Sequence, residues 1–394
     1  MFKKNKNYIL IIGNGFDIGL HLPTKYTDFM THLLMYRCNL KKLPMPTYKN
    51  NNELYKMFEK KMNNWRNKYQ PDINTFDNTI FKNILILILI FKYNHMELFR
   101  LYGHSGKKNA TNSFGKITLF PEWVEKEDFK KKEIGGSDIH WFNVEEILLE
   151  ISNSETYVKI IDEINNKSRN SSILSQNQIE ISKTINYDDL KNGLIFIKSS
   201  LSIYLQCVQD IYLNPSNNQT RNYFQDICNI LELRKDKNIK KYTQIISLNY
   251  TNSAEKLFGN IKTEYPHGKI KSECPEKSKI VLGCYNCTDE NNFDTSFIDF
   301  QKYYQRILLR TGNYETIDSK ELYIDFYGFS CDPADKELIN SLLQELDKVR
   351  QIRIFCYKDS SQIIINLIKS IGREVVLKLT KKNILEFKLI SEAT

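Results

Sequence analysis

The segment at residues 8–29, YILIIGNGFDIGLHLPTKYTDF, constrains the fold more than any other part of the chain. Residues 8–12 form an apolar, β-branched run without polar alternation, which is typical of a strand buried on both faces of a parallel sheet. The chain then turns at Gly13 and Gly15, where the missing Cβ atoms allow backbone amides to approach a phosphate. Asp17 follows, where a carboxylate can accept from a ribose or carboxamide donor. This pattern predicts a nucleotide site, but the third glycine of the dinucleotide fingerprint is missing. The alternative is a plain turn in which Asp17 caps the next helix.

After about residue 240, short apolar runs alternate with amphipathic stretches. We predict strands at residues 243–248, 262–265, 279–282, 322–327, 352–357 and 375–377. We predict helices at residues 251–258, 295–309, 332–349 and 361–371. Strands that alternate with helices indicate an α/β fold with a doubly wound, mostly parallel, Rossmann-like sheet.

The residues between these two parts have mainly helical periodicity. We predict helices at residues 24–37, 51–69, 141–151, 188–212 and 223–233. Residues 75–101 are open between helix and strand, and residues 102–138 and 153–186 have the polar composition of loops or linkers. We therefore expect residues 1–30 and 241–394 to form the α/β core, with residues 31–240 as a large, mainly helical insertion.

The basic balance of the chain is mild. The formal charge of +9 comes from 56 Lys and Arg against 47 Asp and Glu, and the excess is scattered along the sequence. A nucleic-acid-binding protein normally gathers its basic residues on one face, and only short patches such as residues 130–132 occur here. A solvated, lysine-rich surface is the favoured interpretation. A nucleic-acid-directed effector is the alternative.

Cysteine usage and hydropathy indicate the compartment. Eight cysteines in 394 residues do not make a disulfide framework, and the start of the chain has no pattern of a cleavable signal peptide. Cys284 and Cys287 form one CxxC pair, with no second pair to complete the four ligands of a structural zinc site. The apolar run at residues 84–91 is too short for a membrane helix, which needs about 20 residues. We expect a cytoplasmic protein without a metal or a membrane contact.

Three further segments directly follow predicted strands, where ligands of open α/β sheets bind. Asn249 lies at the tip of the strand at residues 243–248, and His267 follows the next short run. Gly328 and Ser330 close the strand at residues 322–327. Because the carboxyl ends of parallel strands share one edge, we expect these residues to lie near the glycine turn.

The order of motifs along the chain resembles the AbiH family of bacteriophage abortive-infection proteins. The motifs are GNGFD…LPTKYTDF, WFNVEE, SLNYTNSAE, YPHGK, LGCYN, FQKYYQR, YGFSCDPADKELI and NLIKSIG. They cover both ends of the chain, in the family's order. That family in turn is similar to a distant branch of the sirtuin-like NAD-binding fold, in which a glycine turn, an Asn after a strand and a His-Gly pair surround the nicotinamide ribose. The resemblance therefore implies NAD as a substrate or ligand.

The resemblance also implies roles for individual residues. Asp17, Asn249 and His267 would be catalytic. The amide of Asn249 can donate and accept, so it would orient a water or a ribose hydroxyl at the anomeric carbon. His267 would be the general base, because an ordinary histidine pKa of about 6.5 lies near working pH. The cofactor-binding residues would be Gly13, Asn14 and Gly15 beneath the diphosphate and Ser330 toward the adenosine, together with Phe16 and Gly328.

Each of these residues also has a structural interpretation. Asn249 would cap a helix that begins near Thr251, His267 would be an ordinary turn histidine, and Ser330 would cap the helix after it. The sequence also departs from the family, because Phe329 stands where a histidine is common. The paired cysteines that hold zinc in protein-deacylating sirtuins are missing too, which disfavours deacetylation.

These residues lead to a hypothesis of a phage-defence effector that hydrolyses the nicotinamide-ribosyl bond of NAD when triggered. Breaking that bond builds positive charge on the ribose, which polar neighbours of the site can stabilise. The expected partners are NAD or a related nucleotide, a phage-derived trigger, and a second copy of the chain or a defence partner protein. A nucleotide-binding sensor without turnover is the second possibility, and a nucleic-acid-directed effector is the third.

Overall fold

The computed structural model describes residues 6–37, 51–69, 85, 88, 89, 144–170, 184–233, 242–284, 295–311, 321–343, 347–357 and 359–390. The chain forms two compact units. The first unit comprises Met1–Thr24, Leu205–Asp289 and Gln301–Thr394, and the second comprises Lys25–Tyr204 and Glu290–Phe300. The domain boundaries predicted at residues 30 and 240 stay a prediction.

The first unit is built on a six-stranded sheet in which every pair of neighbouring strands is parallel. The strands are β1 (Lys6–Ile12), β2 (Gln244–Ser247), β3 (Lys262–Glu264), β4 (Glu321–Tyr327), β5 (Val349–Tyr357) and β6 (Leu385–Ile390). Their order across the sheet is β3-β2-β1-β4-β5-β6. The predicted doubly wound, Rossmann-like sheet is therefore confirmed.

The strand order reverses between β1 and β4. Ile12 is in register with Ser247 of β2 on one side and with Tyr327 of β4 on the other. The carboxyl ends of the three central strands thus lie at one edge, and ligands of such sheets bind where the order reverses. The predicted turns after β1 and β4 both fall at this point.

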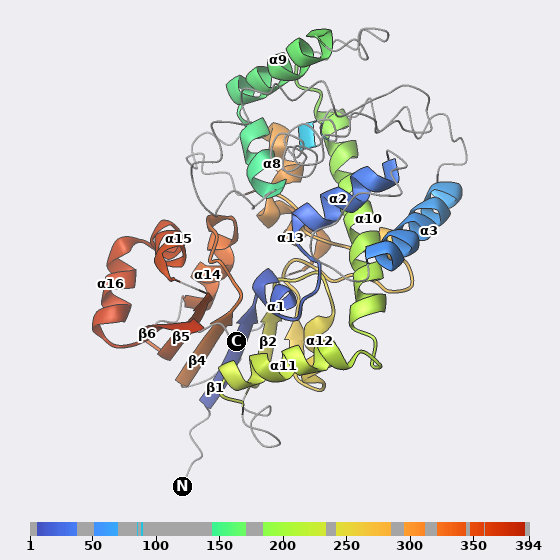
Figure 1. The fold of residues 1–394 in the computed structure, drawn as a ribbon. Helices are drawn as coiled ribbons and strands as arrows, with labels where there is room; N and C mark the ends of the chain where they lie inside the picture. Colours follow the sequence, from blue (N-terminus) through green and yellow to red (C-terminus); the bar gives the residue numbers. More distant parts are fainter. Residues whose placement is uncertain are drawn as a thin grey trace, which may run out of the picture. The chain divides into compact units, whose positions relative to one another are not determined.

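Helices cover both faces of this sheet (Figure 1). Apolar side chains of one face, such as Ile11 and Ile324, share a buried core with Leu338, Leu367 and Leu379 of the helices that cover it. These helices are α14 (Lys336–Leu343), α15 (Ser361–Ile371) and α16 (Arg373–Lys381). The other face is covered by α1 (Asn14–Gly19), α11 (Asn218–Ile230) and α12 (Ser253–Phe258). The first unit also holds η4 (Pro275–Lys277), α13 (Lys302–Leu309) and η6 (Pro333–Asp335).

The described elements of the second unit are helices. They are α2 (Tyr26–Arg37), α3 (Asn51–Tyr69), α8 (Val144–Ser152), α9 (Ser154–Asn170), η5 (Thr295–Phe300) and the first part of α10 (Tyr187–Tyr212). Buried aromatic rings pack here, with His32 in contact with Phe58 and Tyr204. The predicted mainly helical character is confirmed for the described residues. Among the helices that the structure describes, none is long and apolar enough to span a bilayer. The predicted loop at 102–138 and most of 75–101 lie outside the described residues.

Four local predictions are wrong. Residues 153–186 were expected as a linker, but α9 occupies their first half because Tyr157, Ile160, Ile161 and Ile164 repeat at helical spacing and are buried. The predicted strand at 375–377 lies inside α16, where Val376 and Leu379 are buried on one side of the helix.

The other two errors concern strands. Residues 279–282 form no strand, because the backbone of Leu282 bonds to the side chain of Gln305 instead of a neighbouring strand. The sequence prediction also missed β6. This strand lies at the edge of the sheet and has only partial burial, which weakens its hydropathy pattern.

Candidate functional site

The two glycine turns at the reversal point touch each other through their backbones. The N–H of Gly15 donates to the carbonyl oxygen of Gly328 at 2.8 Å, and the N–H of Gly13 donates to that of Tyr327 at 3.2 Å. Gly328 has a φ of +63°, and a Cβ there would collide with the backbone of Gly15 and Phe16. Glycine is thus required because two backbones pack without side chains between them.

This contact uses the amides that were predicted to bind a diphosphate. Besides the two glycine N–H groups, the N–H of Phe16 donates to the carbonyl oxygen of Gly13 at 2.9 Å. The side chain of Asn14 is bonded to Thr24, whose hydroxyl donates to Asn14 Oδ1 at 2.7 Å. The structure therefore brings Gly13, Asn14, Gly15, Phe16 and Gly328 together in a tightly bonded turn. Their role in cofactor binding stays a prediction, and these amides would have to exchange partners to contact a phosphate.

Asp17 lies in α1 and is almost fully buried, with 1% of its surface exposed. Its Oδ1 accepts from the hydroxyl of Ser253 at 2.5 Å, and its Oδ2 accepts from that of Thr251 at 2.6 Å. It therefore does not cap a helix. It joins the turn after β1 to the segment after β2.

Burial raises the pKa of Asp17 to about 6, although hydrogen bonds from Ser253, Thr251 and Asn249 lower it. The cause is desolvation, which disfavours the charged carboxylate. Neutral hydroxyls offset this cost only in part because they carry no full positive charge. A carboxyl group with a pKa near 6 can hold or release a proton near neutral pH.

Asn249 lies beside Asp17. The amide is close enough to help lower the pKa of Asp17. Its Nδ2 is buried and, among the described residues, has no hydrogen-bond partner of normal geometry. Asn249 does not cap α12, which begins at Ser253 after Asn252. A buried donor whose contact with the protein has poor geometry is a candidate to bind a water or a ligand oxygen.

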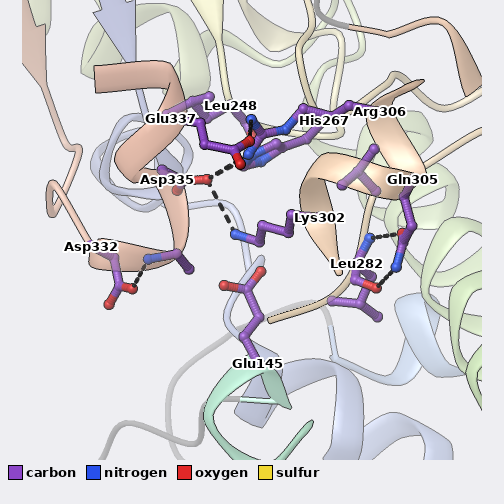
Figure 2. A network of polar contacts seen from close by, with 12 residues as sticks. Glu145, Leu248, His267, Leu282, Lys302, Gln305, Arg306, Asp332, Asp335 and Glu337 are labelled. Atoms are coloured by element: carbon purple, nitrogen blue, oxygen red, sulfur yellow. Dashed lines mark hydrogen bonds and ion pairs between the residues drawn. The ribbon is translucent and has the colours of Figure 1, made fainter. Parts of the chain in front are cut away.

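His267 belongs to a second buried network, which Figure 2 shows. Its Nε2 lies 2.8 Å from Asp335 Oδ1, and its Nδ1 lies 3.2 Å from the carbonyl oxygen of Leu248. The ammonium of Lys302 donates to the same Asp335 oxygen at 3.2 Å, and Arg306 lies 3.6 Å from it. Three basic side chains thus converge on one carboxylate.

The charges within this network shift the pKa values of Asp335 and His267. Burial alone would raise the pKa of Asp335, but Lys302 and His267 outweigh burial and hold that pKa below its ordinary range. Burial lowers the pKa of His267, and the charges of Lys302 and Arg306 lower it further, against the opposite effect of Asp335. Both ring nitrogens of His267 face oxygen acceptors. Its predicted role as general base stays a prediction and requires one of these contacts to open.

The main chain after β2 links the two networks. Leu248 contacts His267 through its carbonyl oxygen, and the next residue, Asn249, lies beside Asp17. Ser330 is different, because its side chain is exposed and its carbonyl oxygen accepts from Asn366 Nδ2 at 2.9 Å. It caps no helix, since Asp332 caps η6. In the part of the chain that the structure describes, no hydrogen bond or ion pair joins Ser330 to Asp17 or His267.

Several residues of both networks were not predicted from the sequence. They are Thr251, Ser253, Lys302, Arg306 and Asp335. All five lie within motifs that carry the family resemblance: SLNYTNSAE, FQKYYQR and CDPADKELI. Lys302 and Arg306 are four residues apart on α13, the spacing that places two side chains on one side of a helix. That spacing was a usable signal.

The cysteine pair gives no metal centre that can be described. Cys284 is buried, whereas Cys287 lies outside the described residues. Within the described ranges, no group of three or more His, Cys, Asp and Glu side chains is arranged to hold a metal ion.

The sheet order and the turns at its reversal define the class of this protein, a doubly wound Rossmann-like α/β protein with a helical insertion. The sequence model of one family, described as bacteriophage abortive infection AbiH, matches residues 9–357. The chain therefore belongs to the AbiH family, which associates it with abortive infection of phage-infected bacteria. No curated protein and no solved structure was found to match the chain.

Proposed function

We propose that this AbiH protein hydrolyses the nicotinamide-ribosyl bond of NAD during phage infection. The observation that supports the proposal is the meeting of Asp17 and Asn249 at adjacent strand ends, beside the reversal of strand order. Nucleotides bind at such reversals in doubly wound sheets. The buried Nδ2 of Asn249, whose contact with Asp17 lies outside normal hydrogen-bond geometry, supplies a donor for a ribose oxygen or a water.

The chemistry fits these two side chains. As the bond to nicotinamide breaks, positive charge develops on the ribose, and the bonding electrons leave with nicotinamide as a neutral amide. The carboxylate of Asp17 stabilises that charge, and Asn249 orients the water that attacks the anomeric carbon. The products are nicotinamide and ADP-ribose, and the water loses one proton. Because the pKa of Asp17 is about 6, the carboxylate is mostly ionised at pH 7.

The test measures NAD and free nicotinamide in bacteria that express the protein, with and without phage. The wild type should consume NAD after infection, whereas Asn249→Ala and Asp17→Asn should leave the NAD pool intact. Asn229→Ala is the matched control, because Asn229 is exposed on α11. Equal NAD loss with Asn249→Ala, or no NAD loss with the wild type, would contradict hydrolysis.

A sensor that binds the nucleotide without turnover is the second candidate. It is favoured by the contacts of His267, both of whose ring nitrogens face acceptors, and by the glycine turn, whose amides bond within the chain. Calorimetric titration with NAD separates the two. A sensor binds NAD and releases no nicotinamide, even in extracts of infected cells.

A further inference from the structure

Two buried glutamines on α10 are bonded to each other, and one of them, Gln209, contacts the loop that binds Asp17. Gln209 is 1% exposed and Gln206 is 4% exposed. The Oε1 of Gln209 accepts from the backbone N–H of Asn252 at 2.6 Å. The Nε2 of Gln209 donates to Gln206 Oε1 at 3.0 Å, and Gln206 Nε2 donates to Asp210 Oδ1 at 2.6 Å. The three side chains form one continuous hydrogen-bonded row.

The direction of this row is fixed by its last member. An ionised carboxylate only accepts, so Asp210 requires the NH₂ group of Gln206 to point at it. The oxygen of Gln206 then faces Gln209, whose NH₂ group must point back, and the oxygen of Gln209 is left for Asn252. Neither amide can flip without placing like groups against each other.

The bonded residue stands between the two partners of Asp17. Asn252 is flanked in sequence by Thr251 and Ser253, and their hydroxyls bind the two carboxylate oxygens of Asp17. The hydrogen bond from the N–H of Asn252 to Gln209 therefore fixes the middle of the three-residue loop whose two outer residues bind Asp17. Within the described residues, Gln209 is the side chain that accepts the hydrogen bond from the N–H of Asn252.

We propose that Gln209 is a positioning residue, which holds the 251–253 loop where Thr251 and Ser253 can bind both oxygens of Asp17. Its effect on Asp17 is independent of any reaction, whereas its effect on NAD hydrolysis rests on the proposed function. Tyr265 is a further titratable group near Asp17. Burial, Glu255 and Asp17 raise the pKa of Tyr265, so it stays neutral while Asp17 titrates.

The test is the titration of Asp17 in the whole protein. Aspartate labelled with ¹³C at the carboxyl group gives NMR signals, and that of Asp17 is the signal lost in Asp17→Asn. In Gln209→Met the loop loses its anchor and the two hydroxyls bind Asp17 less well. Since these bonds lower the pKa of Asp17, that pKa should rise above the wild-type value by about one unit. Gln225→Met is the matched control, because Gln225 bonds to Asn229 on the same surface helix.

A second variant and a second measurement complete the test. Gln206→Met frees the amide of Gln209 to flip, and should give a smaller rise in the same direction. In the wild type, the N–H of Asn252 should be protected from hydrogen exchange. An unchanged pKa of Asp17 in the variants that fold, or an unprotected Asn252 N–H in the wild type, overturns the proposal. A shifted pKa in a protein without NAD turnover supports the positioning role and rejects only the proposed function.

Discussion

Asp17 and Asp335 are both buried near the carboxyl edge of one sheet, but their surroundings shift their pKa values in opposite directions. Two neutral hydroxyls bind Asp17, and burial raises its pKa to about 6. Asp335 faces His267, Lys302 and Arg306, and these neighbours hold its pKa below the ordinary range. The difference shows that burial alone does not set acidity. The charge of the hydrogen-bond donors decides which carboxyl group exchanges a proton near neutral pH.

The two buried carboxylates also differ in what they can do. A carboxylate fixed by Lys302, Arg306 and His267 joins elements that are remote in sequence, but it does not readily gain or lose a proton. A carboxylate held only by neutral donors, as Asp17 is, is costly to bury, and its raised pKa lets it exchange a proton near neutral pH. We therefore interpret Asp335 as mainly structural, whereas the catalytic role of Asp17 stays a prediction.

Removing the charge of Asp335 should produce the largest effect. Asp335→Asn leaves buried cations without their carboxylate, and should lower the free energy of unfolding at pH 7 by about 3–5 kcal/mol. Urea denaturation measures this loss. Asp347→Asn, on an exposed aspartate, is the control and should change little. A loss for Asp335→Asn no larger than for this control would show that the buried cations do not depend on the Asp335 carboxylate.

The two carboxyl groups should contribute to the free energy of unfolding with opposite pH dependence, and Asp17→Asn tests the contribution of Asp17. The folded pKa of Asp17 is raised from 3.8 to about 6, so its stabilising contribution is complete below pH 3.8 and is lost as the pH rises through 6. The upper value of this loss is about 3 kcal/mol. Asp17→Asn should therefore gain stability relative to the wild type between pH 4.5 and 8. For Asp335, whose folded pKa is lowered, the contribution is present above pH 4 and is lost in acid. Urea denaturation at several pH values measures this. If the free energy of unfolding changes with pH in the same way for the wild type and Asp17→Asn, the raised pKa of Asp17 is contradicted.

The hydroxyls that bind Asp17 should have graded effects. Ser253→Ala should raise the pKa of Asp17 more than Thr251→Val does, because the bond from Ser253 lowers it more. Each change should be about one unit or less. Carboxyl ¹³C NMR measures the shift, with Thr243→Val at an exposed threonine as the control. A fall in the pKa of Asp17 in either variant would reverse the interpretation of these bonds.

The rim of the Asp335 network should respond least. Glu337 lies 3.5 Å from Arg306, and 45% of its side chain is exposed. Water screens such a pair, so Glu337→Gln should change the free energy of unfolding by less than about 1 kcal/mol. Thermal denaturation at low and high salt tests this. A loss as large as that of Asp335→Asn would extend the buried network to Glu337.

The sequence predicted those parts of the fold in which local pattern and tertiary burial agree. The strand before Gly13 and the helix at Ser361–Ile371 have unbroken apolar patterns, and both are present. Residues 279–282 show the limit, since an apolar run whose backbone bonds to Gln305 resembles a strand in sequence. Such side-chain partners depend on tertiary structure and leave no local periodicity.

The site was predictable to a similar extent. Asp17 and Asn249 were found because each follows a strand, and the strand order then places them side by side. The partners of His267 were not found, since Asp335 lies 68 residues away and no spacing rule links the two. Motif order located the segments, but only the fold could pair their side chains.

The central position of β1 has a consequence for how this protein is made. Its two neighbours in the sheet, β2 and β4, begin at Gln244 and Glu321, so β1 leaves the ribosome long before either partner exists. At about 5–20 residues per second, synthesis of the missing neighbours takes roughly a quarter of a minute or more. During that time an apolar strand has two open edges, which are prone to aggregation. Nascent chains that end before β4 should need chaperones, and completion of the sheet is expected to be the slow step in folding.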